Sequence, residues 1–265
     1  MRGALTVAGI EVEVRAPQGP LEAVLLERYA PFLGATRSPA CRVWFEPSGA
    51  ADGDENPPMA DVDGGAGRHV HVDHVDFTAE LDLEGDGKVV TAANALTVDH
   101  FLRVLFALLA PRHRATMLHA CGVMSDGRAG VFAVQSGAGK STLASLAGTR
   151  PLLSDEHVMV RELDGAWVAA STPFWGSYAK PGPARVAPLS VLFELSQWPR
   201  NQIRPLDRAE GLRVALEHAV MPSLDPDVRR AVFDVSADLA GAVDAAQLCF
   251  TPNESVWELV DARVA

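Results

Sequence analysis

The sequence Arg128-Ala-Gly-Val-Phe-Ala-Val134 is followed at once by Gln135-Ser-Gly-Ala-Gly-Lys-Ser-Thr142, and this pair of segments is the most informative part of the chain. The apolar, β-branched first part predicts a strand, and Leu143 to Ala147 predict a helix after the glycines. A strand, a glycine-rich loop and a helix place successive backbone N–H groups around phosphate oxygens. We therefore predict a nucleotide-binding loop that holds ATP through Ser136, Gly137, Ala138, Gly139, Lys140, Ser141 and Thr142.

Lys140 is the charged residue of this loop that would contact the phosphates of ATP. Only three of the 23 basic residues are lysines, Lys88, Lys140 and Lys180, so a lysine here indicates a need for a compact ammonium. In a phosphate loop Lys140 would contact the β- and γ-phosphates, and Ser141 would bind Mg²⁺. The match to G-x-x-x-x-G-K-[ST] is incomplete, because Val134 occupies the first glycine position.

Two acids follow close behind. Asp155 and Glu156 lie fifteen and sixteen residues beyond Lys140, at the start of a strand predicted over 152–160. ABC and helicase-type ATPases place this acid much further on, and the chain contains no Leu-Ser-Gly-Gly-Gln sequence. A close acid is typical of kinases, where a carboxylate lies beside the transferring phosphate. A solvated turn is the alternative for the pair.

The segments Leu118-His-Ala-Cys-Gly-Val123, Ser136-Gly-Ala-Gly-Lys-Ser-Thr142 and Leu153-Ser-Asp-Glu-His-Val158 resemble the catalytic domain of the HPr kinase/phosphorylase family. That family shares its P-loop core with ATP-dependent phosphoenolpyruvate carboxykinase. The resemblance runs from about Leu118 to the carboxyl end. The run Thr172-Pro-Phe-Trp-Gly176 looks more like the smaller kinase-like relatives found in peptide-modification gene clusters.

The resemblance implies roles for individual side chains. His119, twenty-one residues before Lys140, would contact the transferring phosphoryl group, and Asp155 would accept the proton of a serine hydroxyl. Glu156, where the family usually has a second Asp, would join Asp155 and Ser141 in holding Mg²⁺. The catalytic residues are thus expected to be Asp155, His119 and Lys140. The multimers known in the family make a homo-oligomer an expectation.

The fold class expected from these patterns is mixed α/β, with a P-loop core and a β-rich amino-terminal region. We expect the β-rich region with its acidic loop at 1–95 and the kinase-like catalytic domain at 96–265. Expected strands cover 5–14, 41–45 and 68–83. Helices are expected over 21–33, over 97–110 with Thr97 as N-cap, from Asp207 with Glu210 completing a capping box, and from Asp225-Pro226.

The composition excludes several classes of protein. A formal net charge of -11 argues against nucleic acid as a partner. No apolar stretch reaches the roughly 20 residues of a membrane span, and Glu11 and Glu13 interrupt any signal peptide, so we expect a cytoplasmic protein without a membrane partner. The three scattered cysteines fit neither a disulfide framework nor a zinc knuckle. His69 and His71 share one strand face, but we expect them to be solvent-facing residues and not metal ligands.

The leading functional hypothesis is an ATP-dependent kinase that transfers the γ-phosphate to a hydroxyl, expected to be serine, of a protein or peptide. A small-molecule kinase is an alternative, although such enzymes usually begin with their phosphate loop, and here 138 residues precede Gly139. A nucleotide-binding regulatory module without catalysis is the other alternative, because Val134 and Glu156 depart from the usual pattern.

Overall fold

The structure is a computed structural model that describes residues 1–49, 53, 59–64, 67–133, 139–174, 176 and 183–264. It separates into two compact units: unit 1 is Met1–His113 with Met221–Ala231, and unit 2 is Arg114–Val220 with Val232–Ala265. The division after His113 lies beyond the expected domain boundary at 95/96. It falls there because the helix that follows residue 95 packs its aromatic face on the sheet of unit 1.

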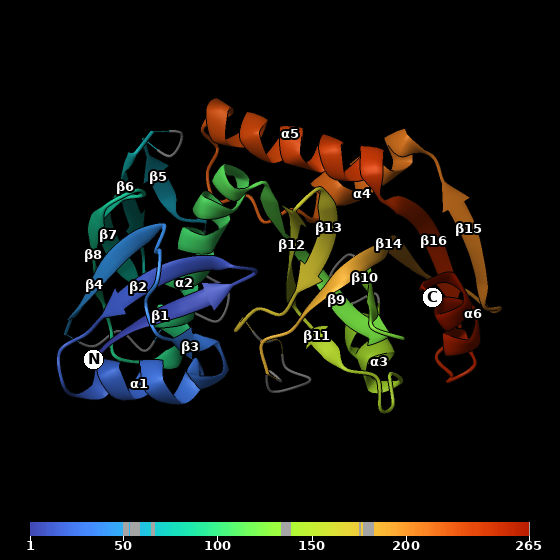
Figure 1. Ribbon diagram of the computed structural model, residues 1–265, viewed down its shortest axis with the longest axis horizontal. Coiled ribbons are helices and arrows are strands. Elements are labelled where there is room, and N and C mark those ends of the chain that lie inside the picture. The colour runs from blue at the N-terminus through green and yellow to red at the C-terminus, as the bar shows by residue number, and fades with distance from the viewer. Residues whose placement is uncertain are drawn as a thin grey trace. The chain divides into compact units, whose positions relative to one another are not determined.

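Unit 1 is built on one mixed sheet with the strand order β3-β1-β2-β4-β8-β7-β6-β5 (Figure 1). The strands are β1 (Arg2–Val7), β2 (Ile10–Arg15), β3 (Leu33–Gly34), β4 (Cys41–Pro47), β5 (Asp61–Asp63), β6 (His69–His74), β7 (Phe77–Asp82) and β8 (Asp86–Thr91). The single strand expected over 5–14 is wrong. Ala8 and Gly9 both take positive φ angles, which makes the two-residue turn of a hairpin between β1 and β2.

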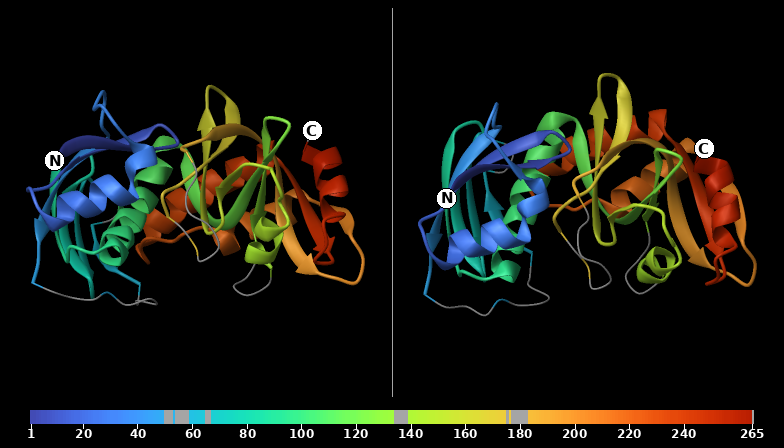
Figure 2. Two further views of the ribbon diagram at one scale, coloured as in Figure 1. Left: turned by 90° about the horizontal axis from the view of Figure 1, so that it is seen from below. Right: turned by 60° about the horizontal axis from the view of Figure 1, so that its bottom comes forward.

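Two helices pack on the sheet of unit 1, and Figure 2 shows them next to each other. They are α1 (Pro20–Arg28) and α2 (Ala95–Leu109), each followed by a short 3-10 turn, η1 (Ala30–Phe32) and η2 (Ala110–His113). Phe101 of α2 meets Phe45 and Phe77 edge to face at 5.5 and 5.4 Å. The helix starts two residues earlier than expected, because the Asn94 side chain, not Thr97, caps it by accepting a hydrogen bond from Thr97 N.

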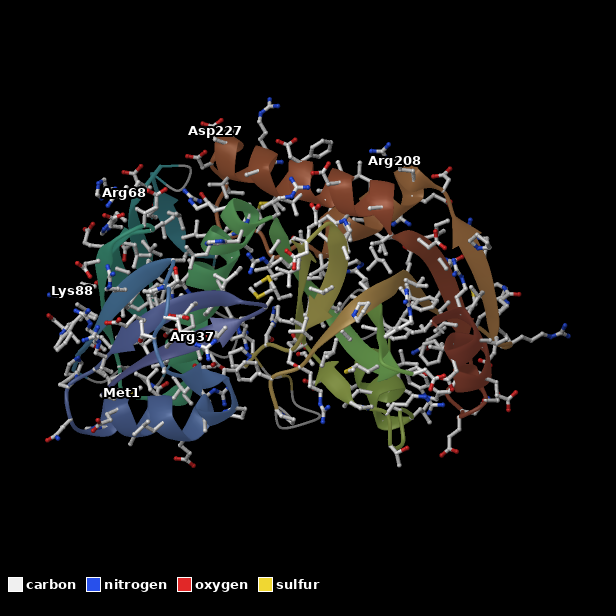
Figure 3. The ribbon with its side chains drawn as sticks, viewed as in Figure 1. Met1, Arg37, Arg68, Lys88, Arg208 and Asp227 are labelled. Atoms are coloured by element: carbon white, nitrogen blue, oxygen red, sulfur yellow. The ribbon has the colours of Figure 1, made fainter. Side chains whose placement is uncertain are left out.

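Some acidic residues on the strands of unit 1 form local ion pairs with basic side chains. Arg68 pairs with Asp82 at 2.6 Å, and Lys88 pairs with Glu46 at 2.7 Å. Figure 3 shows Arg68 and Lys88 projecting outward from the strands. Surface pairs of this kind contribute little to stability, so they indicate a solvated face.

Unit 2 contains the second mixed sheet, of strand order β10-β9-β12-β13-β14-β16-β15, with β11 also paired to β9 and β10 also paired to β14. The strands are β9 (Ala115–Ser125), β10 (Arg128–Ala133), β11 (Leu152–Ser154), β12 (His157–Leu163), β13 (Ala166–Ala170), β14 (Val186–Gln197), β15 (Gln202–Leu206) and β16 (Asp244–Phe250). The expected hairpin turn is confirmed, with Asp126 and Gly127 both at positive φ between β9 and β10.

Successive side chains along a strand of this sheet pack into two different hydrophobic cores. Val131 packs into one core with Val214 of α4 (Arg208–His218) and Leu239 of α5 (Pro226–Ala242). Its neighbour Phe132 packs into the other core, with α3 (Lys140–Ser145) and α6 (Val256–Val264). This two-residue period lets one short strand anchor helices on both faces.

The fold is therefore mixed α/β, as expected, with two large mixed sheets and six α-helices among the described residues. Residues 136–138 of the expected phosphate loop, and residues 134 and 135 before it, lie outside those residues, so a P-loop core remains a prediction. Within the described part of the chain, no helix combines the length and the apolar character that crossing a bilayer requires.

Candidate functional site

Lys140 is the first residue of α3, and its position depends on the glycine before it. Gly139 is the N-cap, with φ of 122°, and a Cβ built there would come within 2.8 Å of the Phe250 ring. The residue must therefore be glycine for two reasons, backbone conformation and space. With the helix start fixed this way, the Lys140 side chain is held 92% buried instead of extending into solvent.

His119 lies on β9, directly opposite His157 of β12 in the antiparallel register. The two rings are 5.5 Å apart between centroids. Lys140 Nζ lies 2.8 Å from His119 Nε2, and Glu156 Oε1 lies 2.8 Å from the same nitrogen. The fold thus brings His119 and Lys140 together, although they are twenty-one residues apart in sequence, and their roles in a site stay predictions.

The two acids occupy a turn, not the start of a strand. The strand expected over 152–160 is interrupted after Ser154, and Asp155 and Glu156 connect β11 to β12. Ser154 stabilises the break, because its hydroxyl accepts hydrogen bonds from Glu156 N and His157 N, both at 3.1 Å. The break places Asp155 and Glu156 between the two strands and not within either of them. Asp155 is 5% exposed, whereas the Glu156 side chain is about one third exposed.

The proton on His119 Nε2 decides which neighbour it binds. Without a proton, Nε2 has a lone pair that accepts a hydrogen bond from Lys140 Nζ. With a proton, Nε2 donates to Glu156 Oε1. One ring nitrogen cannot do both, so the two 2.8 Å contacts describe alternative hydrogen bonds of a single group. The side chains Lys140, His119 and Glu156 together form a line of exchangeable protons, which we call the proton line.

Burial and neighbouring charges shift the pKa values of Glu156 and Lys140 in opposite directions. Burial alone would raise the pKa of Glu156, but the hydrogen bond from His119 and the charges of His119, His157 and Lys140 outweigh it and lower that pKa to about 2. Burial lowers the pKa of Lys140, and the carboxylates of Glu156 and Asp155 act in the opposite sense. Glu156 is therefore ionised at neutral pH, and it keeps a buried ammonium in place.

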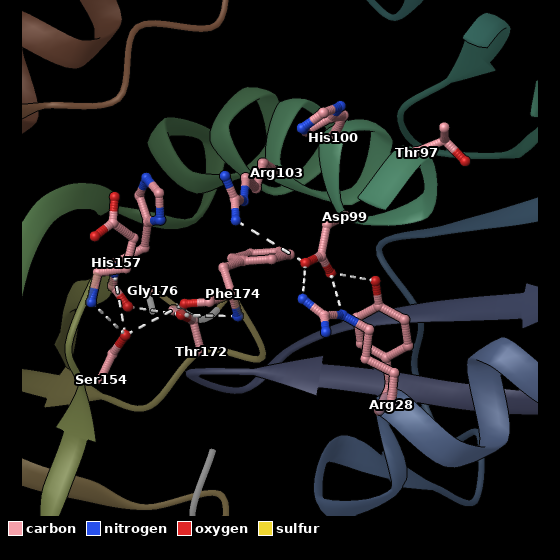
Figure 4. Close-up of polar contacts among 12 residues, drawn as sticks. Arg28, Thr97, Asp99, His100, Arg103, Ser154, His157, Thr172, Phe174 and Gly176 are labelled. Carbon is pink, nitrogen blue, oxygen red and sulfur yellow. Dashed lines mark hydrogen bonds and ion pairs between the residues drawn. The ribbon is translucent and has the colours of Figure 1, made fainter. Parts of the chain in front are cut away.

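Gly176, the last residue of the Thr172-Pro-Phe-Trp-Gly176 run, lies against the acids. Gly176 N donates a 3.0 Å hydrogen bond to Asp155 Oδ1, and a Cβ at Gly176 would stand 2.8 Å from Asp155 Oδ2 and 3.1 Å from Glu156 Oε2. Figure 4 shows how the run is tied down: Ser154 Oγ donates to Phe174 O, and Thr172 Oγ1 donates to His157 O at 2.6 Å. Thr172, Phe174 and Gly176 are therefore held beside the turn that carries the two acids.

Sequence reasoning missed His218. It is the last residue of α4, is 7% exposed, and is followed by Ala219, which bridges to Leu118 beside His119. Burial lowers its pKa, and the positive charges of His119 and Lys140 lower it further. No motif marks His218, because it joins the site only through the pairing of α4's end with β9.

Part of the expected site cannot be placed. Ser136, Gly137 and Ala138 lie outside the described residues, as does Lys180. Ser141 is exposed on the first turn of α3 and Thr142 is half-buried, and among the described contacts no hydrogen bond joins Ser141 to Asp155 or Glu156. The described structure thus brings together His119, Lys140, Asp155 and Glu156, and the metal and nucleotide roles of the loop residues remain predictions.

No protein-family model matches the chain, and no curated protein is similar to it. Among solved structures, it is similar to the Hpr(Ser) kinase/phosphatase from Coxiella burnetii, with 11% sequence identity and a TM-score of 0.32. The match covers 56% of this chain and 93% of that chain. Because the TM-score is this low, we base the functional proposal on the side chains of unit 2.

Proposed function

We propose that the chain is a Mg²⁺-dependent kinase that transfers the γ-phosphate of ATP to a serine hydroxyl of a protein or peptide. The observation that supports this most directly is the proton line, with the Lys140 ammonium, the His119 imidazole and the Glu156 carboxylate joined through 2.8 Å contacts beside buried Asp155. A cation, a titratable ring and two acids in one place are the groups that phosphoryl transfer uses.

The donor set suits a polyphosphate and its cation. Lys140 is a compact ammonium held in place by its burial, and its hydrogen bonds would turn from His119 to phosphate oxygens when a nucleotide enters. Ser141, Asp155 and Glu156 supply the oxygen ligands that Mg²⁺ prefers and would hold the ion. When bound, Mg²⁺ would neutralise phosphate charge.

Asp155 is the group proposed to move a proton. As the serine oxygen bonds to the γ-phosphorus, the bond from that phosphorus to the bridging oxygen breaks and ADP leaves, while Asp155 takes the hydroxyl proton. The hydrogen bond from Gly176 N to Oδ1 fixes the orientation of the carboxyl group. Once Lys140 turns to phosphate, an N–H at His119 Nε2 would be able to donate a hydrogen bond to a phosphate oxygen.

Nucleotide binding is tested by calorimetry with ATP and MgCl2. We expect Lys140→Ala to weaken binding strongly without unfolding unit 2, because the ammonium meets the site and not the apolar cores. Lys88→Ala is the matched control, since Lys88 is an exposed lysine paired with Glu46. Undiminished affinity in Lys140→Ala would exclude a phosphate site at this residue.

Catalysis is tested by transfer from γ-labelled ATP to serine-containing peptides, chosen from genes adjacent to this one. Asp155→Asn keeps the shape of the side chain but loses its basicity, so ATP should still bind while transfer falls by about 10²–10⁴-fold. Asp234→Asn, on the exposed side of α5, is the control. Equal rates in Asp155→Asn would end the assignment of Asp155. Nucleotide binding without transfer to any peptide would favour a regulatory module.

A further inference from the structure

A second cluster of titratable side chains lies in unit 1 and has no part in the proposed kinase site. His74 ends β6, Asp76 lies in the turn to β7, and His100 lies on α2. His100 Nδ1 is 2.5 Å from Asp76 Oδ2, and His74 Nδ1 is 3.8 Å from the same oxygen. One ligand atom from each of the three residues lies within 4.8 Å of the others.

The backbone explains why these three groups converge. Side chains alternate along β6, so His74 shares the inward face with Val70 and Val72, whereas His69 and His71 face outward. The turn then brings Asp76 back toward His74, whose Nδ1 accepts a hydrogen bond from Asp76 N at 3.1 Å. The His74 ring stacks on Phe77 at 4.7 Å, which fixes its orientation.

The cluster is held away from solvent. The side chains of His74 and Asp76 are each 4% exposed, and that of His100 is 7% exposed. Buried charged groups in proteins are paired or bind metal ions, and two imidazole rings lie beside the Asp76 carboxyl group. Figure 4 shows His100 on α2, one residue along from Asp99, which is engaged by Arg28.

We propose that His74, Asp76 and His100 bind a divalent transition-metal ion of the zinc class. Two imidazoles and one carboxylate are ligands that Zn²⁺ accepts, with a water completing the coordination. Tetrahedral zinc with bonds near 2.0 Å separates its ligand atoms by about 3.3 Å. The 2.5 Å contact must open and the 3.8 Å contact must close, each by less than about 1 Å, and the third pair of ligand atoms, within 4.8 Å of each other, must close by up to about 1.5 Å. His74 Nδ1 must also release the hydrogen bond from Asp76 N when it binds the ion. The ion takes the place of the proton between His100 Nδ1 and Asp76 Oδ2.

Such an ion would link the β6–β7 turn to α2. These elements are separated by more than twenty residues of sequence but pack together through Phe77 and Phe101. Metal bound by the folded state alone stabilises that state by mass action. The consequence is that zinc raises the thermal midpoint of the protein.

The test uses the full chain, stripped with a chelator and then titrated with ZnCl2 against a chromophoric zinc indicator. We expect one equivalent to bind with sub-micromolar affinity, together with a rise in the thermal midpoint. His74→Gln and His100→Gln should each weaken binding by more than about 100-fold, since loss of even an outer partner of a metal ligand costs 10–100-fold. Glutamine keeps much of the volume and hydrogen bonding, and circular dichroism checks that each variant is folded.

Two controls separate this site from the others. The double variant His69→Gln/His71→Gln changes two exposed histidines of the same strand and should bind zinc as the wild type does. His119→Gln tests the kinase site and should also leave zinc binding unchanged. Failure of wild-type protein to bind an equivalent of zinc would overturn the proposal, and Asp76 and His100 would then be a buried hydrogen-bonded pair. Loss of binding only in His119→Gln would overturn it too, by placing the zinc in unit 2.

Discussion

Gly176 brings main chain closer to the two acids than any residue with a side chain could. The Cβ of alanine would stand 2.8 Å from Asp155 Oδ2, and Asp155 is too buried to move freely. We therefore expect Gly176→Ala to displace the carboxyl group by a few tenths of an ångström or more. Misplacement approaching 1 Å lowers a reaction rate by about 10²-fold, so transfer should fall toward that value while nucleotide affinity changes much less.

The matched control for this prediction is Gly34→Ala, because nothing lies within 4 Å of a Cβ at Gly34. Both variants are compared in the labelled-ATP assay and by calorimetry. A Gly176→Ala protein with wild-type transfer would show that the contact between Gly176 and Asp155 does not position the Asp155 carboxyl group.

The lowered pKa of His218 in the folded protein predicts that stability depends on pH. Burial, then His119 and Lys140, lower its pKa in the folded state below the ordinary 6.5. As pH falls below 6.5, the unfolded state therefore binds the proton first, and stability is lost; above 6.5 the full stability is present. We expect His218→Gln to lose less stability than the wild type between pH 7.5 and pH 5.5.

Urea unfolding midpoints at several pH values measure this difference. His69→Gln is the control, because it removes an exposed histidine from unit 1 and should follow the wild-type curve. Parallel curves for wild type and His218→Gln would contradict a role for His218 charge in stability.

At the scale of elements, the break between β11 and β12 matters most for the site. An unbroken strand would have paired the Asp155 and Glu156 backbone with β9 along its whole length. In the turn that forms instead, Glu156 O still accepts a hydrogen bond from Ala120 N of β9 at 3.0 Å. The Ser154 hydroxyl takes up the two N–H groups that the break would otherwise leave unpaired.

Helix α4 begins at the capping box that the sequence predicts. Glu210 N donates to Asp207 Oδ1 at 2.8 Å, and Asp207 N donates to Glu210 Oε2 at 2.9 Å. Removing an N-cap costs about 1 kcal/mol, so Asp207→Ala should lower the thermal midpoint by about 2–4 °C. Asp234→Ala, at an exposed interior position of α5, is the control and should not lower it. A midpoint unchanged in Asp207→Ala would mean that α4 is held by packing alone.

At the scale of the whole molecule, the reactivity of the three cysteines tests whether both units are folded. Cys41 of unit 1 and Cys121 and Cys249 of unit 2 are free thiols, 2%, 0% and 6% exposed. Burial raises the pKa of Cys41 and of Cys121 to about 12, and the thiolate is the reactive form.

We therefore expect the folded protein to react with a thiol reagent at pH 8 at least about 10³-fold more slowly than protein unfolded in urea, since the unfolded fraction of a folded protein is of that order or lower. Absorbance of the released thiolate measures both rates, and urea should reveal three thiols. One thiol reacting at its unfolded rate in native protein would show that part of a unit is open.

Much of the local structure follows from short-range patterns. The Asp126-Gly127 turn, the Asp207/Glu210 cap and the helix starting at Pro226 are each confirmed, because each depends on neighbours within about four residues. The errors are also local. Ala8-Gly9 was too weak a turn signal to divide a run of alternating apolar residues, and Asn94 took the cap that Thr97 could equally have supplied.

The sequence alone shows which groups unit 2 contains and in what order: a glycine before Lys140, a histidine before them and two acids after them. Which of these groups meet depends on contacts between distant segments. Strand register puts His119 opposite His157, the pairing of Ala219 with Leu118 adds His218, and the packing of α2 on β7 gathers His74, Asp76 and His100. The physical reason is that local patterns are read from backbone preferences of adjacent residues, whereas these contacts follow from burying apolar faces of elements far apart in the chain.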